Sequence, residues 1–253
     1  MKNTRIEIDL PPVSVIIPAY NEERWIETTV SSVLESGFPC EVIVVDDGST
    51  DKTPQILRGF GARIRLITHP VNKGKGAAIV SAIKEATGEI VVFCDAHLLG
   101  LNEYHLLFLV LPLIYGTARA VLGQGAPEGI PLTRAFSPTM ILTGQRAYFK
   151  QDLMPLAEEM ENLGYGVETF LFSRFGRDRT AAVILPGLTH LVKKDTSSPA
   201  AATLAYLREM KEILETVARV EDIAPKELTQ LRKAVFSLLA KYTARVEKSE
   251  GAA

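Results

Sequence analysis

Four short apolar runs in the first hundred residues constrain the fold of this chain more than any other feature. They are VSVIIP, EVIVVD, RIRLIT and EIVVFC, at residues 13–18, 41–46, 63–68 and 89–94. Each run is continuously apolar rather than alternating, which is typical of strands covered by helices on both faces. Helical patterns separate the runs, at residues 22–35, 52–60 and 76–86. The sequence therefore predicts an α/β domain built on a largely parallel sheet.

The remainder of the chain divides into two parts. Residues 119–199 combine short apolar runs with Gly and Pro clusters, and we expect them to form one side of a cleft. From residue 200 apolar residues recur at helical spacing, which predicts two amphipathic helices at about 200–220 and 225–246. We expect these helices to pair as a hairpin that packs on its own domain or on a second copy, forming a homodimer. The predicted domains are therefore 1–199 and 200–253.

The overall charge and the cysteines restrict the classes of function. A formal net charge of -2 gives no basic surplus, so we expect no nucleic-acid partner. The two cysteines, Cys40 and Cys94, each lie beside an apolar run and are expected to be buried free thiols. Free thiols indicate a reducing compartment, and we expect a cytoplasmic protein.

The most hydrophobic window, residues 98–118, is the candidate for a membrane segment. Polar residues and a proline interrupt it, whereas a membrane-spanning helix needs about 20 predominantly apolar residues. We therefore expect a buried helix and no transmembrane segment. The apolar stretch at residues 13–17 is also too short for the core of a signal peptide.

Polar residues follow the first two predicted strands directly. The first run leads into Pro18-Ala19-Tyr20-Asn21-Glu22-Glu23, and the second into Asp46-Asp47-Gly48-Ser49-Thr50-Asp51. In open parallel sheets, ligands bind at the carboxyl ends of the strands. A carboxylate there can accept hydrogen bonds from ribose hydroxyls or a base N–H, and a glycine lets the backbone approach a ligand. A strand–turn–helix with a well-capped helix would also explain VVDDGSTD.

Two further segments carry charged residues toward the same edge. Asp95-Ala96-His97 follows the fourth run, and Asn72-Lys73-Gly74-Lys75-Gly76 precedes the third predicted helix. The glycine–lysine segment is not a P-loop, because the pattern G-x-x-x-x-G-K-[ST] is absent. A solvated lysine turn would also explain it.

Together these elements resemble family-two glycosyltransferases of the GT-A fold, a Rossmann-like mixed sheet flanked by helices. The matching stretches are VSVIIPAYNEE, VIVVDDGSTDKT, NKGKGAAI, VVFCDAHLL, LTGQRAYFK and GYGVET, in this order. The resemblance implies transfer of a hexosyl group from a nucleotide-sugar, a UDP-sugar in particular, to a hydroxyl acceptor. It also implies that Lys75 approaches the base or phosphate and that Asp95 and Ala96 contact the diphosphate. The residues that it implies at the nucleoside are Pro18, Ala19, Tyr20, Glu22 and Asp47.

The third position of the diphosphate motif departs from the usual aspartate, because it is His97. This Asp-x-His sequence resembles the variant of polypeptide N-acetylgalactosaminyltransferases, in which imidazole binds the metal. The chain also resembles the retaining glucosyl-3-phosphoglycerate synthases through PAYNEE, GKG, GYGVE and a histidine after the late apolar run, here His190. These resemblances imply that Asp95, His97 and His190 bind one divalent metal. Either histidine would otherwise have a structural or surface role.

The ligand types predict the metal and its pH dependence. Magnesium favours oxygen ligands, whereas a mixed nitrogen and oxygen site suits manganese, so we expect Mn²⁺ to support more activity than Mg²⁺. Activity should fall below about pH 6.5 as imidazoles protonate.

Glu168 in GYGVET is the candidate catalytic residue. If the reaction inverts, a carboxylate must accept the proton of the acceptor hydroxyl, and Glu168 is the predicted general base. A first-turn glutamate that stabilises the helix dipole would also explain this residue. Two alternatives to an inverting transferase stay open: a nucleotide-binding protein without catalysis, and a retaining enzyme like the phosphoglycerate synthases. A nucleotidyltransferase is disfavoured, because PAYNEE replaces its glycine-rich loop.

Overall fold

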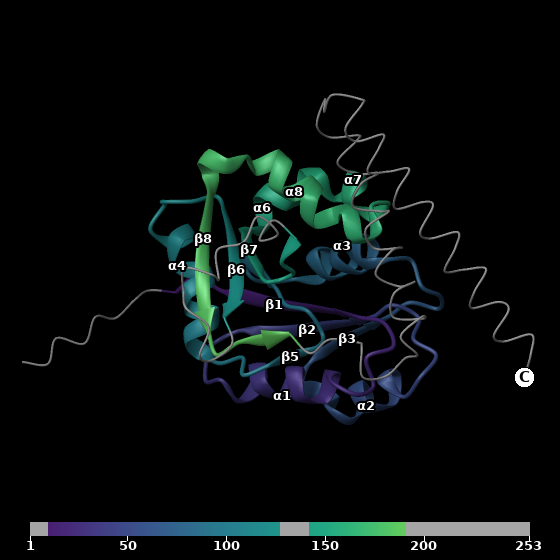
Figure 1. Ribbon diagram of the computed structural model, residues 1–253. Coiled ribbons are helices and arrows are strands. Elements are labelled where there is room, and N and C mark those ends of the chain that lie inside the picture. Colours follow the sequence, from purple (N-terminus) through teal and green to yellow (C-terminus); the bar gives the residue numbers. More distant parts are fainter. Residues whose placement is uncertain (1–9, 127–141, 191–253) are drawn as a thin grey trace, which may run out of the picture.

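The computed structural model describes residues 10–126 and 142–190 of the chain (Figure 1). Seven strands form one sheet in the order β3-β2-β1-β4-β7-β6-β8. Their bounds are β1 Val13–Ala19, β2 Glu41–Asp46, β3 Arg65–Thr68, β4 Ile90–Phe93, β6 Ala120–Ala126, β7 Arg146–Phe149 and β8 Thr180–Pro186.

One half of the sheet is parallel, as the sequence predicts. β1 lies between β2 and β4 and pairs with both in parallel, and β2 pairs with β3 in the same sense. Successive residues of β1 are buried on both faces, so Val15, Ile16 and Ile17 are all fully inaccessible to solvent. The continuous apolar runs are therefore explained by helices that cover both sides of the sheet.

The other half makes the sheet mixed. β7 pairs antiparallel with both β4 and β6, and β6 pairs in parallel with β8. A separate two-stranded ladder pairs β5 (Leu98–Leu99) with β9 (Thr189–His190), with Leu98 opposite His190. This ladder brings the end of the described chain back to the segment that follows β4.

Helices cover the sheet in two layers. One core cluster joins the sheet to α1 (Ile26–Glu35), α2 (Thr53–Gly59) and α4 (Glu103–Ile114). The other joins it to α3 (Lys75–Glu85), α7 (Ala157–Glu161) and α8 (Val167–Phe175). Figure 1 shows α1 and α2 below the strands, and α3, α7 and α8 above them. The short helices are η1 (Gly61–Arg63), α6 (Lys150–Leu153), η3 (Met154–Leu156), η4 (Gly164–Gly166) and η5 (Arg177–Arg179).

The predicted elements agree with the structure except in detail. α1 begins at Ile26 rather than at residue 22, because residues 22–25 form a turn in which the Trp25 N–H donates to the Glu22 carbonyl, 3.0 Å. The helix expected within residues 98–118 is α4, which buries Leu106, Leu109 and Leu113 and leaves Tyr104 60% exposed on its other face. No helix within residues 10–126 or 142–190 has the length and apolar character that crossing a bilayer requires.

Both cysteines are free, as predicted. Cys94 is buried and Cys40 is half-buried, and burial raises the pKa of the Cys40 thiol to about 11. The predicted hairpin at residues 200–246 lies outside the described residues, as does the predicted domain boundary at residue 199.

Candidate active site

The carboxyl ends of β1 and β2 meet at one edge of the sheet. Ala19 at the end of β1 lies opposite Asp46 at the end of β2, and the Asp47 N–H donates to the Ala19 carbonyl, 2.8 Å. Pro18 and Ala19 are the last residues of β1, and Tyr20 directly after them is 38% exposed. The residues predicted to bind a nucleoside therefore cluster at this edge.

Hydrogen bonds join the two loops that leave these strands. Asn21 adopts a left-handed backbone conformation with φ 54°, which asparagine tolerates better than most residues. Its side-chain carbonyl accepts the Thr50 N–H at 2.8 Å, and its own N–H donates to the Ser49 hydroxyl at 2.9 Å. The Glu22 N–H donates to the Thr53 hydroxyl at 2.8 Å. The PAYNEE and DDGSTD motifs thus form one continuous surface.

Asp47 follows β2 and is only 3% exposed. Its Oδ2 accepts the Gly74 N–H at 2.8 Å, and its Oδ1 accepts the Lys73 N–H at 3.0 Å. Nδ1 of His69 lies 2.6 Å from the same Oδ1. The carboxylate therefore holds the loop that leads into α3, and its contact with a nucleoside stays a prediction.

Lys75 is the first residue of α3 and points into the protein. Its Nζ lies 2.8 Å from Asp95 Oδ1 and 2.6 Å from Glu168 Oε1. Burial lowers the pKa of Lys75, but the two carboxylates raise it more, so the ammonium is charged at neutral pH. The alternative of a solvated lysine turn is therefore wrong. Lys75 instead connects the Asp95-Ala96-His97 segment with Glu168 of the GYGVET segment.

The glycines on either side of Lys75 have a packing role. A Cβ on Gly76 would lie 2.2 Å from the Met160 carbonyl oxygen, and one on Gly74 would lie 3.4 Å from the Gly164 Cα. Gly74 also has φ +94°, which side chains rarely adopt. The amino end of α3 therefore packs directly on the backbone of residues 160–164, just before Glu168.

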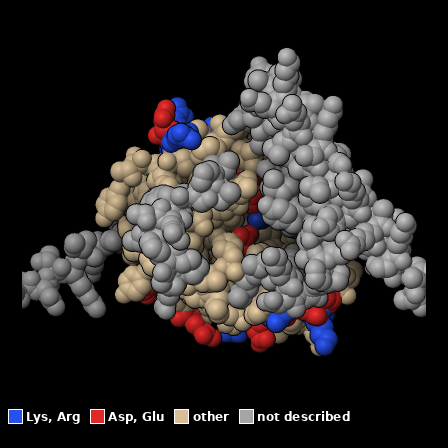
Figure 2. Space-filling model, in the orientation of Figure 1, with Lys and Arg blue, Asp and Glu red and all other residues tan. Residues whose placement is uncertain are grey.

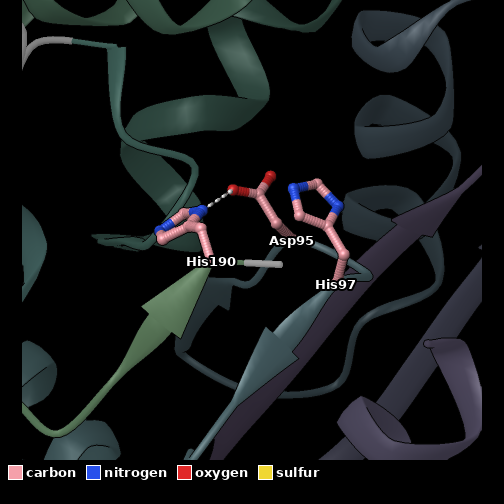
Figure 3. A group of neighbouring side chains, drawn as sticks. All are labelled: Asp95, His97 and His190. Atoms are coloured by element: carbon pink, nitrogen blue, oxygen red, sulfur yellow. Dashed lines mark ion pairs between the residues drawn. The ribbon is translucent and has the colours of Figure 1, made fainter. Parts of the chain in front are cut away.

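Asp95, His97 and His190 lie together, as predicted. Each offers one ligand atom, and these atoms all lie within 4.8 Å of one another. Figure 3 shows the Asp95 carboxylate between the two imidazole rings, with His190 on β9 and His97 just before β5. The pairing of Leu98 with His190 in the β5–β9 ladder produces this arrangement. One carboxylate with two imidazoles fits manganese or cobalt better than magnesium.

The three side chains have different proton affinities. Burial raises the pKa of Asp95, but Lys75, His97 and His190 outweigh it and hold that pKa well below its usual range. Burial lowers the pKa of His190, and together with the nearby His97 and Lys75 it outweighs the Asp95 carboxylate, which acts to raise that pKa. Burial also acts to lower the pKa of His97, but the carboxylates of Glu22 and Asp95 raise it overall. His190 is thus the more readily available neutral ligand.

Glu22 lies nearer to the metal-site residues than the sequence indicated. Its carboxylate is buried, and its Oε1 lies 3.5 Å from Nδ1 of His97. Within the described part of the chain this Nδ1 has no hydrogen-bond partner, so the contact is an ion-pair approach at long range. A carboxylate behind a ligating imidazole fixes its orientation and raises its basicity. Glu22 is therefore positioned to orient His97.

Sequence reasoning missed Gly144 and Gln145, which contact Asp95 from β7's leading loop. The Gln145 side-chain amide donates to Asp95 Oδ2 at 3.0 Å, and a Cβ on Gly144 would lie 2.1 Å from Asp95 Oδ1. The only indication in the sequence was that both residues lie in the LTGQRAYFK stretch, and neither residue is charged. Arg146, also missed, is fully buried and donates to the backbone carbonyl of Glu168 at 2.8 Å.

The arrangement can hold a cation and an anion side by side. Figure 2 shows acidic and basic side chains at the bottom of a hollow in the middle of this face. A fixed ammonium and a divalent-metal ligand set at the carboxyl edge of a nucleotide-binding type of sheet suit a diphosphate. Glu168, with a side chain that is 8% exposed, contacts the same Lys75 ammonium as Asp95.

Comparison with known proteins supports this interpretation. The chain is 37% identical over 131 residues to the glucosyl-3-phosphoglycerate synthase of Mycobacterium tuberculosis, covering 49% of this chain and 37% of that one. It is 31% identical over 216 residues to the same-named protein of Mycolicibacterium paratuberculosis, covering 68% and 64%. The chain thus spans less than two thirds of the length of these curated relatives.

Solved structures match as well. The M. tuberculosis glucosyl-3-phosphoglycerate synthase in complex with Mn²⁺, UDP and glucosyl-3-phosphoglycerate has a TM-score of 0.61 and 28% identity, covering 83% of this chain and 80% of that one. This likeness confirms the predicted GT-A fold. The family model described as glycosyl transferase family 2 matches residues 14–172, which is more than half of the chain. The chain therefore belongs to glycosyl transferase family 2.

Proposed function

We propose that the chain is the catalytic part of a metal-dependent glycosyltransferase that moves a hexosyl group from a UDP-sugar to a hydroxyl acceptor. The observation that carries this proposal is the cluster of Asp95, His97 and His190 beside the Lys75 ammonium. The cluster lies at the strand edge where the PAYNEE and DDGSTD loops meet. The relative solved with Mn²⁺, UDP and a glucosylated product supports the donor and the metal.

Asp95, His97 and His190 would hold the divalent cation, which supplies Lewis-acid stabilisation of negative charge on a departing diphosphate. Lys75 provides a second, permanent positive charge that is already oriented by two carboxylates. Gln145 and Gly144 fix the Asp95 carboxylate from behind. Together these residues favour a leaving group with two phosphates.

Glu168 is the proposed general base if the reaction inverts. Its Oε1 accepts from Lys75 at 2.6 Å, so this contact fixes the carboxylate in place. While this contact lasts, the ammonium competes with an acceptor proton for the same oxygen. The role of Glu168 as a base therefore requires Lys75 to shift toward the diphosphate when the donor binds.

The proposal is tested with a panel of nucleotide sugars. Purified protein is incubated with UDP-glucose, UDP-galactose, UDP-N-acetylglucosamine, GDP-mannose and ADP-glucose, each with Mn²⁺, Mg²⁺ or EDTA. We expect release of UDP from one UDP-sugar, faster with Mn²⁺ than with Mg²⁺, and none in EDTA. Tight UDP binding without turnover of any donor would instead indicate a nucleotide-binding protein without catalysis.

The relatives favour one acceptor for the first trials. Because the curated relatives are named glucosyl-3-phosphoglycerate synthases, we propose 3-phosphoglycerate as the second, narrower candidate. Parallel reactions with 3-phosphoglycerate, glycerol 3-phosphate and no acceptor would show whether the phosphoglycerate stimulates donor turnover. Equal rates in all three would exclude it as the acceptor.

Two further proposals concern the cellular location and the assembly of the chain. The free thiols of Cys40 and Cys94 support a cytoplasmic enzyme. We also propose that residues 200–246 contribute to a homodimer or pack on their own domain. Light scattering on the full chain and on a chain ending at residue 199 distinguishes the two, because only the dimer loses half its mass per particle.

A further inference from the structure

A buried chain of hydrogen bonds links the ends of two strands to the middle of α3. Nδ1 of His69, directly after β3, lies 2.6 Å from Asp47 Oδ1, and its Nε2 lies 2.9 Å from the Ser81 hydroxyl. His69 is 6% exposed and Asp47 is 3% exposed. We call these three residues the Asp47–His69–Ser81 relay.

The same carboxylate holds the loop that precedes α3. The Lys73 and Gly74 amides both donate to Asp47, at 3.0 and 2.8 Å. The backbone at Gly48 also lies against this loop, since a Cβ there would approach the Val71 carbonyl carbon to 2.4 Å. The loop conformation therefore depends on the position of one buried carboxylate.

The relay and Lys75 are connected through helix α3. Lys75 is the next residue after Gly74, and Ser81 lies further along the same helix. His69 therefore links Ser81 in the middle of α3 to Asp47 after β2 through two hydrogen bonds. The hydrogen bond from the Gly74 N–H links the start of the helix to the same Asp47 carboxylate. Lys75 is thereby directed at Asp95 and Glu168.

We propose that His69 and Ser81 are positioning residues of the donor site. Through Asp47 they order residues 72–74 and set the direction of the Lys75 side chain. The identity of the nucleotide bound at this site rests on the proposed function. In one assignment of the imidazole hydrogens, Nδ1–H donates to Asp47 and Nε2 accepts the Ser81 O–H. Neither residue contacts Asp95 or Glu168 in the bonds described above.

A hydrolytic role for the acid–histidine–serine order is disfavoured by the surroundings of the serine. Ser81 lies inside α3, where neighbouring backbone N–H groups are engaged in the helix. A nucleophilic serine requires free donors beside it to stabilise an oxyanion. The relay therefore serves geometry rather than covalent chemistry.

The test compares three relay variants with a matched control. His69→Asn keeps a donor near Asp47 but does not reach Ser81, His69→Ala removes both bonds, and Ser81→Ala removes the outer one. Ser32→Ala is the control, because the Ser32 hydroxyl donates to the Thr28 carbonyl within α1, 2.8 Å, on the opposite side of the sheet. UDP affinity is measured by calorimetry with saturating Mn²⁺, well below each melting temperature.

We expect UDP affinity to fall about tenfold in His69→Ala, as for loss of a buried charged hydrogen bond, with smaller losses in His69→Asn and Ser81→Ala. The donor KM should rise more than kcat falls. Mn²⁺ affinity without nucleotide should change less than twofold, and Ser32→Ala should match the wild type. Unchanged UDP affinity in folded His69→Asn and Ser81→Ala would overturn the proposal.

A second measurement does not depend on nucleotide binding. Amide hydrogen exchange at Lys73 and Gly74 should accelerate in His69→Asn, while amides of α1 stay protected. A downfield imidazole N–H proton resonance should mark the His69–Asp47 bond and disappear in the same variant. If the wild type binds no UDP, the proposed function fails, and the exchange rates alone decide the relay: faster exchange supports it and unchanged exchange refutes it.

Discussion

Substitution of Gly144 by alanine isolates the geometry of the Asp95 carboxylate. The added Cβ would lie 2.1 Å from Oδ1, 2.3 Å from Oδ2 and 2.4 Å from Cγ of Asp95. Real Cβ atoms almost never approach another heavy atom within 3.0 Å, so the carboxylate must retreat by about 0.9 Å. Backbone strain is not a concern, because Gly144 has no positive φ.

The retreat has a consequence for each partner of Asp95. The contacts of Asp95 with Lys75 at 2.8 Å and with Gln145 at 3.0 Å would lengthen. The carboxylate would also move out of its place beside the His190 imidazole. A misplacement of about 1 Å at a reacting centre can cost about 100-fold in rate. Overpacking in a buried site costs about 1–3 kcal/mol of stability. We therefore expect folded protein with about 100-fold lower Mn²⁺-dependent turnover.

The assay separates metal binding from folding. Mn²⁺ binding is followed by electron paramagnetic resonance, turnover by UDP release, and the free energy of unfolding by urea titration. Gly59→Ala, at the end of α2, is the matched control, since no atom lies within 4 Å of its added Cβ. If folded Gly144→Ala keeps turnover within threefold of wild type, activity does not require the Asp95 carboxylate to lie against the Gly144 backbone, and the reasoning is refuted.

Three other predictions follow from the same structure. His97→Ala and His190→Ala should each weaken Mn²⁺-dependent UDP binding in calorimetry while sparing uridine, and full Mn²⁺-dependent activity in either variant would exclude that histidine as a ligand. Glu168→Gln should lower turnover by about 10²–10⁴-fold with UDP affinity nearly intact, and surviving turnover or a retained anomeric configuration in product NMR would argue against a general base. Burial acts to raise the pKa of Glu41, but hydrogen bonds from Ser14, Thr87 and Gly88 lower it below 4.5. These bonds therefore stabilise the fold above pH 4.5, and the stabilisation is lost as the pH falls through the lower folded-state pKa. Glu41→Gln should cost about 1 kcal/mol at pH 7, allowing for screening, and progressively less on acidification, whereas a cost independent of pH in urea titrations would contradict this account.

The sequence was sufficient to predict those features that depend on residues close together along the chain. Continuous apolar runs identify β1, β2 and β4, and the polar residues after them identify the edge where Asp47 and Asp95 lie. Asp95 and His97 are two residues apart, so their proximity follows from local backbone geometry. His190 was found only through resemblance, because its approach to Asp95 depends on the β5–β9 pairing.

Features that depend on distant pairing were not predicted. The insertion of antiparallel β7 between β4 and β6 brings Gln145 to Asp95, and a neutral side chain in a short strand loop gives no warning of this. The contact of Glu22 with His97 and that of His69 with Ser81 likewise join segments that no periodicity relates. The position of His69 directly after β3 was a usable signal, since the other strand ends carry site residues.

The close packing of Gly76 on the Met160 carbonyl has a dynamic consequence. At Gly76, α3 and the segment that leads into α8 touch backbone to backbone, because Gly76 has no Cβ to separate them. Interfaces of this kind slide or separate as whole units rather than deforming gradually. Lys75 and Glu168 would therefore travel together when the protein changes conformation. A shift of Lys75 relative to Glu168 has to come from rotation about the lysine side-chain bonds, on the fast timescale of side chains rather than the slow one of domains.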